Sequence, residues 1–157
     1  PSGAVRWTKA DNLHLTLRFL GDTEAGALPA LQEVLDDEAA RVPAFHLVLG
    51  RLGAFPHPEG PRVLWVGLGG ALSALRRLQR QLELRVRDLG WEAESKPFTP
   101  HLTIGRVRPS SRPNGDGWAE TPVPALELAV DELVLMRSEL GSGGARYTAL
   151  HRSPLSP

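Results

Sequence analysis

The sequence contains no cysteine in 157 residues. This absence excludes disulfide bonds and cysteine-ligated metal, and it fits an oxidising or a reducing compartment equally well. The chain also lacks any run of eighteen apolar residues, so we expect no membrane-spanning helix. Lysine is scarce: 16 of the 18 basic residues are arginine, a bias that we attribute mainly to coding composition, because Ala, Leu, Gly and Pro are also abundant.

Excess charge of either sign is also lacking, since 18 Lys and Arg balance 18 Asp and Glu. Proteins that coat long nucleic acids carry a basic excess, because neutralising many phosphates drives their binding. Any contact of this chain with nucleic acid should therefore be local. Its length and its 41% of hydrophobic residues are enough for the core of one domain.

One short pattern occurs twice, as His14-Leu15-Thr16-Leu17 and as His101-Leu102-Thr103-Ile104. Side chains alternate between the two faces of a β-strand, so each segment has an apolar face and a face that carries His and Thr. A single copy is more simply explained as a solvated strand face. Two copies in matching contexts indicate a functional pair.

The spacing of apolar residues predicts an α+β fold, with helices packed outside mainly antiparallel sheets. Pro109–Pro124 has the composition of a long loop, which we expect to be mobile, and Gly53–Pro61 has that of a turn. The predicted helices are Leu28–Val42 and Leu72–Leu89, and the predicted strands are Leu13–Leu20, Phe45–Leu52, Val63–Leu68, the His101 segment, Leu126–Leu135 and Tyr147–His151.

The segments Asn12–Gly21 and Pro97–Arg106 resemble the paired motifs of the 2H phosphoesterases, in particular the bacterial and archaeal RNA 2′,3′-cyclic phosphodiesterases, also known as 2′-5′ RNA ligases. Weaker similarity lies in Pro61–Gly67, Val134–Leu140 and Gly144–Tyr147. The resemblance covers most of the chain and is specific at the two motifs.

This resemblance implies two pseudo-symmetric lobes of mainly antiparallel sheet, with an active-site groove between them lined by both motifs. We expect residues 1–157 to form a single bilobal domain. Members of the family usually begin with a strand and a helix before the first motif, roughly 30 residues by the size of such a unit. We expect these elements to be absent from this chain, which starts at Pro1.

Hydrolysis of a cyclic phosphodiester needs a base for the attacking water and an acid for the departing ribose oxygen. Two imidazoles supply both without metal, because they titrate near neutrality, and each contributes roughly 10²- to 10⁴-fold. The hydroxyls of Thr16 and Thr103 can donate to the nonbridging oxygens. The resemblance implies that His14 is the acid towards the 3′-oxygen and that His101 is the base, which gives a 2′-phosphate. The two motifs are alike, so the sequence alone does not assign these roles.

The resemblance also implies that Arg106 contacts phosphate and that Phe19 packs against the nucleoside. Both lie five residues beyond a motif histidine, so strict alternation would turn them to the core face. A bulge or strand end is therefore expected near Gly105, and something similar near Phe19. Phe19 and Phe98 are equally well explained as core residues, and Arg18 is a weaker phosphate candidate.

A rival hypothesis makes His14 and His101 zinc ligands. Zinc sites usually need three or four ligands at close local spacing, and no such spacing occurs here. We therefore expect no metal and no cofactor. The other histidines, His46, His57 and His151, have ordinary strand, turn and chain-end contexts.

Two other functions stay open: a noncatalytic module that binds RNA ends, and a phosphodiesterase that acts on small cyclic nucleotides. The sequence does not separate hydrolysis from 2′-5′ ligation. We expect a monomeric, cytoplasmic enzyme whose partners are RNA 3′ ends or nucleotides with a cyclic phosphate, without contact to a membrane. The arginines of the second predicted helix are interpreted as a solvated face: Arg76, Arg77, Arg80, Arg85 and Arg87.

Overall fold

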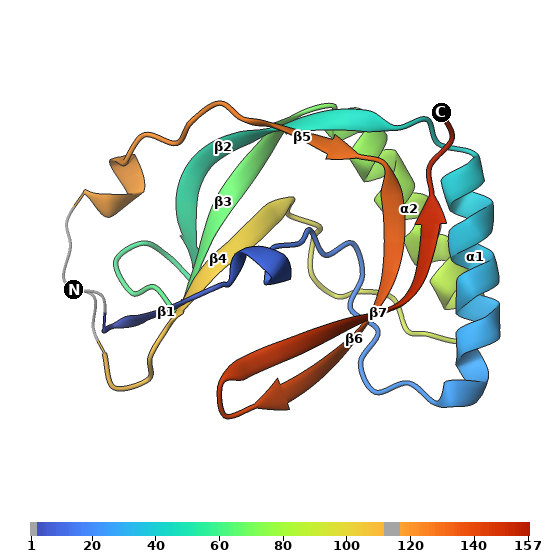
Figure 1. The fold of residues 1–157 in the computed structure, drawn as a ribbon, viewed down its shortest axis with the longest axis horizontal. Helices are drawn as coiled ribbons and strands as arrows, with labels where there is room; N and C mark the ends of the chain where they lie inside the picture. Colours follow the sequence, from blue (N-terminus) through green and yellow to red (C-terminus); the bar gives the residue numbers. More distant parts are fainter. Residues whose placement is uncertain (1–2, 112–116) are drawn as a thin grey trace. The chain divides into compact units, whose positions relative to one another are not determined.

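The computed structural model of the protein describes residues 3–111 and 117–157 (Figure 1). The strand pairs β1–β4, β3–β4, β2–β3 and β6–β7 are antiparallel, so the predicted α+β class is confirmed. The elements are β1 Val5–Trp7, α1 Leu28–Ala40, β2 Phe45–Phe55, β3 Val63–Gly70, α2 Leu72–Asp88, β4 His101–Val107, β5 Glu127–Val130, β6 Glu132–Gly141 and β7 Gly144–Pro154, with 3₁₀ helices η1 Ala10–Asn12, η2 Ala25–Ala27 and η3 Trp118–Glu120.

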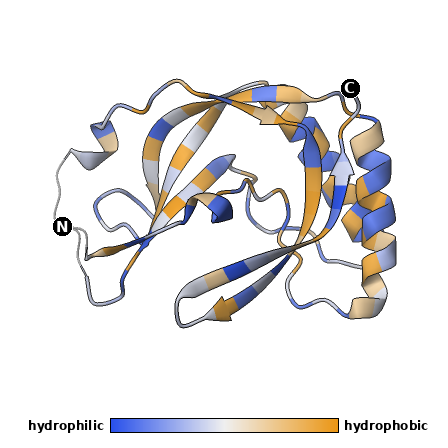
Figure 2. Ribbon diagram, viewed as in Figure 1, coloured by the Kyte–Doolittle hydropathy of each residue, from blue (hydrophilic) through white to orange (hydrophobic). Residues whose placement is uncertain are grey.

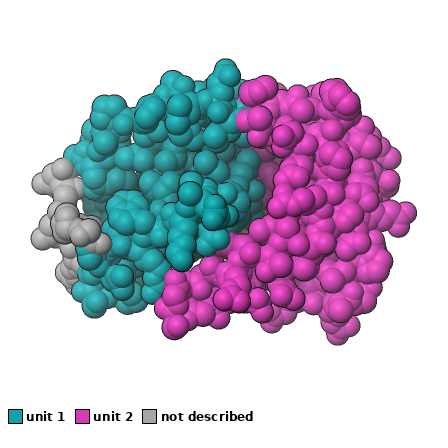
Figure 3. Space-filling model, in the orientation of Figure 1, with its two compact units in different colours: residues 1–16, 47–70, 99–128 teal, residues 17–46, 71–98, 129–157 magenta. Residues whose placement is uncertain are grey.

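The chain divides into two compact units, coloured separately in Figure 3. The first unit comprises residues 1–16, 47–70 and 99–128 and holds most of a five-stranded sheet of order β1-β4-β3-β2-β5. The second comprises residues 17–46, 71–98 and 129–157, with both α-helices and the β6–β7 pair. Both His-x-Thr segments belong to the first unit.

The core of the second unit is formed in large part by apolar residues that repeat at helical spacing. Apolar residues of α1 face α2, β6 and β7, and Figure 2 shows the alternation of apolar and polar residues around this helix and along the strands. No helix in the described ranges is long and apolar enough to span a membrane. The buried cluster consists of Leu31, Val34, Leu35, Ala39, Leu78, Leu82, Val86, Leu133, Leu135 and Leu155.

In the first unit, the sheet has one apolar face and one that carries the polar motif residues. Leu64 and Val66 of β3 are buried, while Trp65 between them turns to the opposite face and is half-buried. The register pairs Trp65 with Thr103 and the neighbouring Gly67 with His101. Directly paired residues share a face, so Trp65 and the motif residues lie on the same side of the sheet.

The predicted strand Leu13–Leu20 is wrong. Only Leu15 pairs, in an isolated antiparallel bridge with Leu102. Beyond Thr16 the chain enters the second unit, where side chains take the place of a neighbouring strand: Gln79 donates to the carbonyl of Leu17 at 3.4 Å, and Trp91 donates to that of Leu20 at 2.9 Å. These carbonyls are satisfied without a sheet ladder.

The remaining predictions differ from the structure mainly at the ends of elements. β2 continues through Phe55 into the predicted turn, and the predicted strand Leu126–Leu135 is divided between β5 and β6. The division falls at Asp131, whose carbonyl accepts a hydrogen bond from Leu155 at 2.8 Å. Part of the predicted mobile loop, residues 112–116, lies outside the described residues.

Candidate active site

The bridge between Leu15 and Leu102 brings the two motifs together. In an antiparallel pairing the residues on either side of a bridge also face one another, so His14 lies opposite Thr103, and Thr16 opposite His101. All four side chains then share the face opposite Leu15 and Leu102. The two histidines are diagonal neighbours, a relation in which Cα atoms are roughly 7 to 8 Å apart.

Both imidazoles are held in the same way. Nδ1 of His14 lies 2.6 Å from the carbonyl oxygen of Asn12, and Nδ1 of His101 lies 2.5 Å from that of Thr99. A carbonyl only accepts, so Nδ1 must carry the proton in each ring. Nε2 is then the basic nitrogen of each neutral ring. Each histidine is half-buried, and each accepting carbonyl lies two residues upstream.

Aromatic rings surround His101. The Phe55 ring meets the imidazole edge to face, with centroids 5.1 Å apart, and the Trp65 centroid lies 6.2 Å away. These contacts fix the ring plane of His101. Sequence analysis did not place Phe55 or Trp65 in the site. The signal in the sequence was that each aromatic residue lies two positions from a glycine, Phe55 from Gly53 and Trp65 from Gly67. The glycines have no side chains, so they leave room for the rings on that face of the sheet.

A β-bulge brings Arg106 to the motif face. Leu64 pairs with Gly105 but Trp65 pairs with Thr103, which leaves Ile104 as the extra residue of β4. Val63 pairs with Arg106, so this arginine returns to the side of Trp65 and Thr103. The bulge expected near Gly105 is confirmed. The phosphate contact of Arg106 itself stays a prediction.

The other substrate candidates belong to the second unit. Phe19 is 69% exposed, which removes the alternative that it is a core residue, and Phe98 is half-buried. Their contacts with substrate stay predictions. The guanidinium of Arg18 pairs with Glu83 at 2.5 Å and donates to the carbonyl of Glu92, which disfavours this weaker phosphate candidate.

The arginines of α2 are mostly exposed, as predicted for a solvated face. Arg85 is the exception. It pairs with Asp37 at 3.0 Å and with the buried Glu38 at 2.9 Å, and the hydrogen bond that it donates to Asp37 is the largest cause that raises the pKa of Arg85. Across residues 3–111 and 117–157, no three His, Cys, Asp or Glu side chains form a group that could hold a metal ion.

Comparison with known proteins gives a consistent result. An RNA 2′,3′-cyclic phosphodiesterase of Aeropyrum pernix is 38% identical over 104 residues, which are 66% of this chain and 58% of that protein. The enzyme of the same name from Methanothermobacter thermautotrophicus is 34% identical over 149 residues, covering 92% of this chain and 79% of the relative.

Similarity extends to solved structures and to a family model. The crystal structure of Escherichia coli LigT complexed with 3′-AMP aligns with a TM-score of 0.76 at 32% identity, covering 100% of this chain and 84% of that one. The model of the 2′-5′ RNA ligase superfamily matches residues 6–142, which include both His-x-Thr segments. The chain therefore belongs to the 2′-5′ RNA ligase superfamily.

Proposed function

We propose that the protein hydrolyses RNA 2′,3′-cyclic phosphate ends to 2′-phosphates, without metal, by acid and base catalysis from His14 and His101. The observation that carries this proposal is the matched pair of hydrogen bonds from Nδ1 of each ring to a backbone carbonyl. Both rings have the same tautomer, and both belong to segments joined at the Leu15–Leu102 bridge. Two such imidazoles can act on opposite sides of one phosphorus.

In the proposed reaction, neutral His101 accepts a proton from water at Nε2 as the water oxygen attacks phosphorus. The bond from phosphorus to the ribose 3′-oxygen breaks, and His14, protonated at Nε2, donates its proton to that oxygen. The products are a 2′-phosphate and a 3′-hydroxyl. One proton enters His101 and one leaves His14, so an exchange with solvent restores the starting state.

Negative charge accumulates on the nonbridging oxygens in this reaction. Thr16 and Thr103 stand across the bridge from the opposite motif's histidine, where their hydroxyls can donate to these oxygens. Arg106 lies on the same face through the bulge in β4 and adds a fixed positive charge. We assign Phe19 and Phe98 to packing against the nucleoside.

The names of the relatives support the substrate class, since the Aeropyrum and Methanothermobacter proteins are both called RNA 2′,3′-cyclic phosphodiesterase. The LigT complex with 3′-AMP supports nucleotide binding in this superfamily. Ligation differs only in the entering group. A ribose 5′-hydroxyl in place of water would expel the same 3′-oxygen and leave a 2′-5′ linkage.

Incubation of the purified protein with an oligonucleotide ending in 2′,3′-cyclic phosphate, in excess chelator, tests this proposal. We expect full turnover and a product that carries only 2′-phosphate, identified by its mass and by comparison with synthetic 2′- and 3′-phosphate standards. A 3′-phosphate product would contradict the assigned polarity of the two histidines. Loss of activity in chelator, restored by zinc, would contradict the metal-free mechanism.

A further inference from the structure

Two arginines stand directly opposite one another at the end of the first unit's sheet. Arg6 of β1 pairs in register with Arg106 of β4, and both are exposed. Directly paired residues project from the same face of a sheet. Arg6 therefore shares the face that carries His101, Thr103 and Arg106.

Like charges placed directly opposite one another destabilise a sheet. Neither Arg6 nor Arg106 has an acidic partner in an ion pair within residues 3–111 and 117–157, whereas Arg18, Arg85 and Arg152 all have one. Arg108, one residue beyond the end of β4, continues the alternation of that strand, and its amide donates to the carbonyl of Ala4 at 2.9 Å. This concentration of positive charge is compensated best by a bound anion.

The position of Arg6 indicates which anion. Arg106 lies about four strand positions from His101 once the bulge is counted, which is roughly 13 Å along the strand. A long side chain at Arg106 can extend back towards a phosphate held at the histidines. Arg6 lies beside Arg106, roughly 4.8 Å across the sheet on β1, along the edge of β4 that also pairs with Leu15. Because Arg106 contacts the reacting phosphate in the proposed function, Arg6 is left for the adjacent phosphate of the same RNA end.

We propose that Arg6, beside Arg106, binds the phosphate on the 5′ side of the terminal nucleoside. This inference rests on the proposed function, because it presumes that the cyclic phosphate occupies the His14 and His101 site. A guanidinium matches a phosphate with two parallel N–H donors. The site then favours ends that carry such a phosphate, as a phosphodiester or as a 5′-phosphate, over a bare nucleoside 2′,3′-cyclic phosphate.

The test compares three substrates that end in the same cyclic phosphate: a nucleoside with a free 5′-hydroxyl, the same nucleoside with a 5′-phosphate, and a dinucleotide. We expect kcat/KM of the wild type to be higher for both phosphate-bearing substrates than for the bare nucleoside. The ratio of kcat/KM for a phosphate-bearing substrate to kcat/KM for the bare nucleoside measures this preference. In Arg6→Gln we expect this ratio to fall about tenfold, which is about the effect of losing one charged hydrogen bond. If only the dinucleotide ratio falls, the bound group is the phosphodiester.

Arg6→Lys, which keeps the charge, should restore part of the ratio, and Arg51→Gln, at an exposed arginine of β2, should leave it at the wild-type value. Relief of charge repulsion should keep the melting temperature of Arg6→Gln at or above that of the wild type. An unchanged ratio in Arg6→Gln would overturn the inference.

A readout without turnover separates this inference from the proposed function. Binding of a dinucleotide 2′-phosphate and of a nucleoside 2′-phosphate can be compared by calorimetry. We expect the ratio of their Kd values to change about tenfold in Arg6→Gln. A wild type that hydrolyses none of the three substrates would contradict the proposed function, whereas an unchanged Kd ratio would contradict the role of Arg6.

Discussion

Gly53 shows how a single residue shapes the surroundings of His101. A Cβ atom at this position would lie 2.1 Å from the Trp65 ring, which rests against the glycine backbone. The ring centroids of Phe55 and Trp65 are 5.3 Å apart, and both aromatic side chains lie beside His101. A side chain at Gly53 would therefore displace the indole that helps to fix the imidazole.

We predict that Gly53→Ala lowers the free energy of unfolding by about 1 to 3 kcal/mol, because it overpacks the Trp65 site. Urea unfolding measures this change. Gly143→Ala is the matched control, since a Cβ at Gly143 would meet nothing within 4 Å. A Gly53→Ala variant as stable as Gly143→Ala would show that Trp65 has room to move.

At this scale the sequence predicted which face of a strand carries a side chain better than it predicted the packing. The alternation of side chains showed that Arg106 could reach the motif face only through a bulge near Gly105, and β4 has that bulge. Phe55 could not be predicted as a neighbour of His101, because that contact depends on how β2, β3 and β4 are aligned. The ion pair of Arg18 could not be predicted, because its partner Glu83 lies on a helix distant in sequence.

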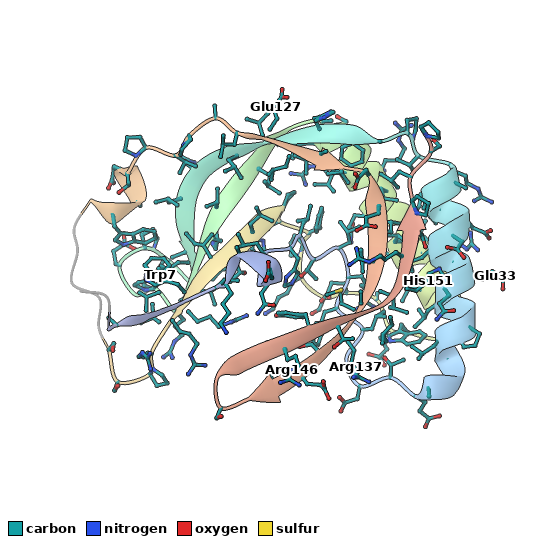
Figure 4. All side chains as sticks on the ribbon, in the orientation of Figure 1. Trp7, Glu33, Glu127, Arg137, Arg146 and His151 are labelled. Atoms are coloured by element: carbon teal, nitrogen blue, oxygen red, sulfur yellow. The ribbon has the colours of Figure 1, made fainter. Side chains whose placement is uncertain are left out.

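At the scale of elements, one polar cluster joins α1 to β7. Asp36 of α1 accepts hydrogen bonds from Ser153 at 2.6 Å and from His151 at 2.8 Å, and Figure 4 shows His151 on β7. Ser153 is fully buried. The hydrogen bond from Ser153, followed by that from His151, holds the pKa of Asp36 below its ordinary value of 3.8.

A carboxyl group with a lowered folded-state pKa stabilises the fold above its unfolded pKa, and this stabilisation is lost as the pH falls through the folded pKa. We predict that Ser153→Ala reduces stability near neutral pH and that the difference from wild type shrinks below about pH 4. Chemical unfolding of both proteins across this range measures the difference. A difference of the same size at all pH values would assign the effect of Ser153 to packing alone.

Helices and strands were predicted correctly where the pattern of apolar residues within one segment is enough to define the element. Both helices agree with their predicted ranges to within two residues at either end, because their buried faces repeat at helical spacing. The Leu13–Leu20 segment has the alternation of a strand, but a strand needs a neighbour. Beyond Leu15 its carbonyls are met by Gln79 and Trp91 instead, and no local pattern reports such partners.

At the scale of the whole molecule, the sequence repeat indicated a pair of motifs, and the structure gathers both in the first unit. The two histidines come from segments far apart in the chain, yet one bridge and two matching carbonyls give them equivalent positions. The resemblance supplied the reaction and its polarity. The hydrogen bonds leave Nε2 of each ring as the nitrogen that can accept or donate a proton, which both proposed roles require.

The central claim is that His14 is the acid and His101 the base of one reaction. The most direct test is the pH dependence of kcat/KM for a cyclic-phosphate end in the wild type, His14→Ala and His101→Ala. His46→Ala serves as the control for an exposed histidine, and circular dichroism verifies the fold.

We predict a bell-shaped profile for the wild type and a loss of at least ~10²-fold in each active-site variant. His101→Ala should lose the rise on the acidic side, because the base is gone, and His14→Ala should lose the fall on the alkaline side, because the acid is gone. Near wild-type turnover in either variant, or the same remaining limb in both, would contradict the account.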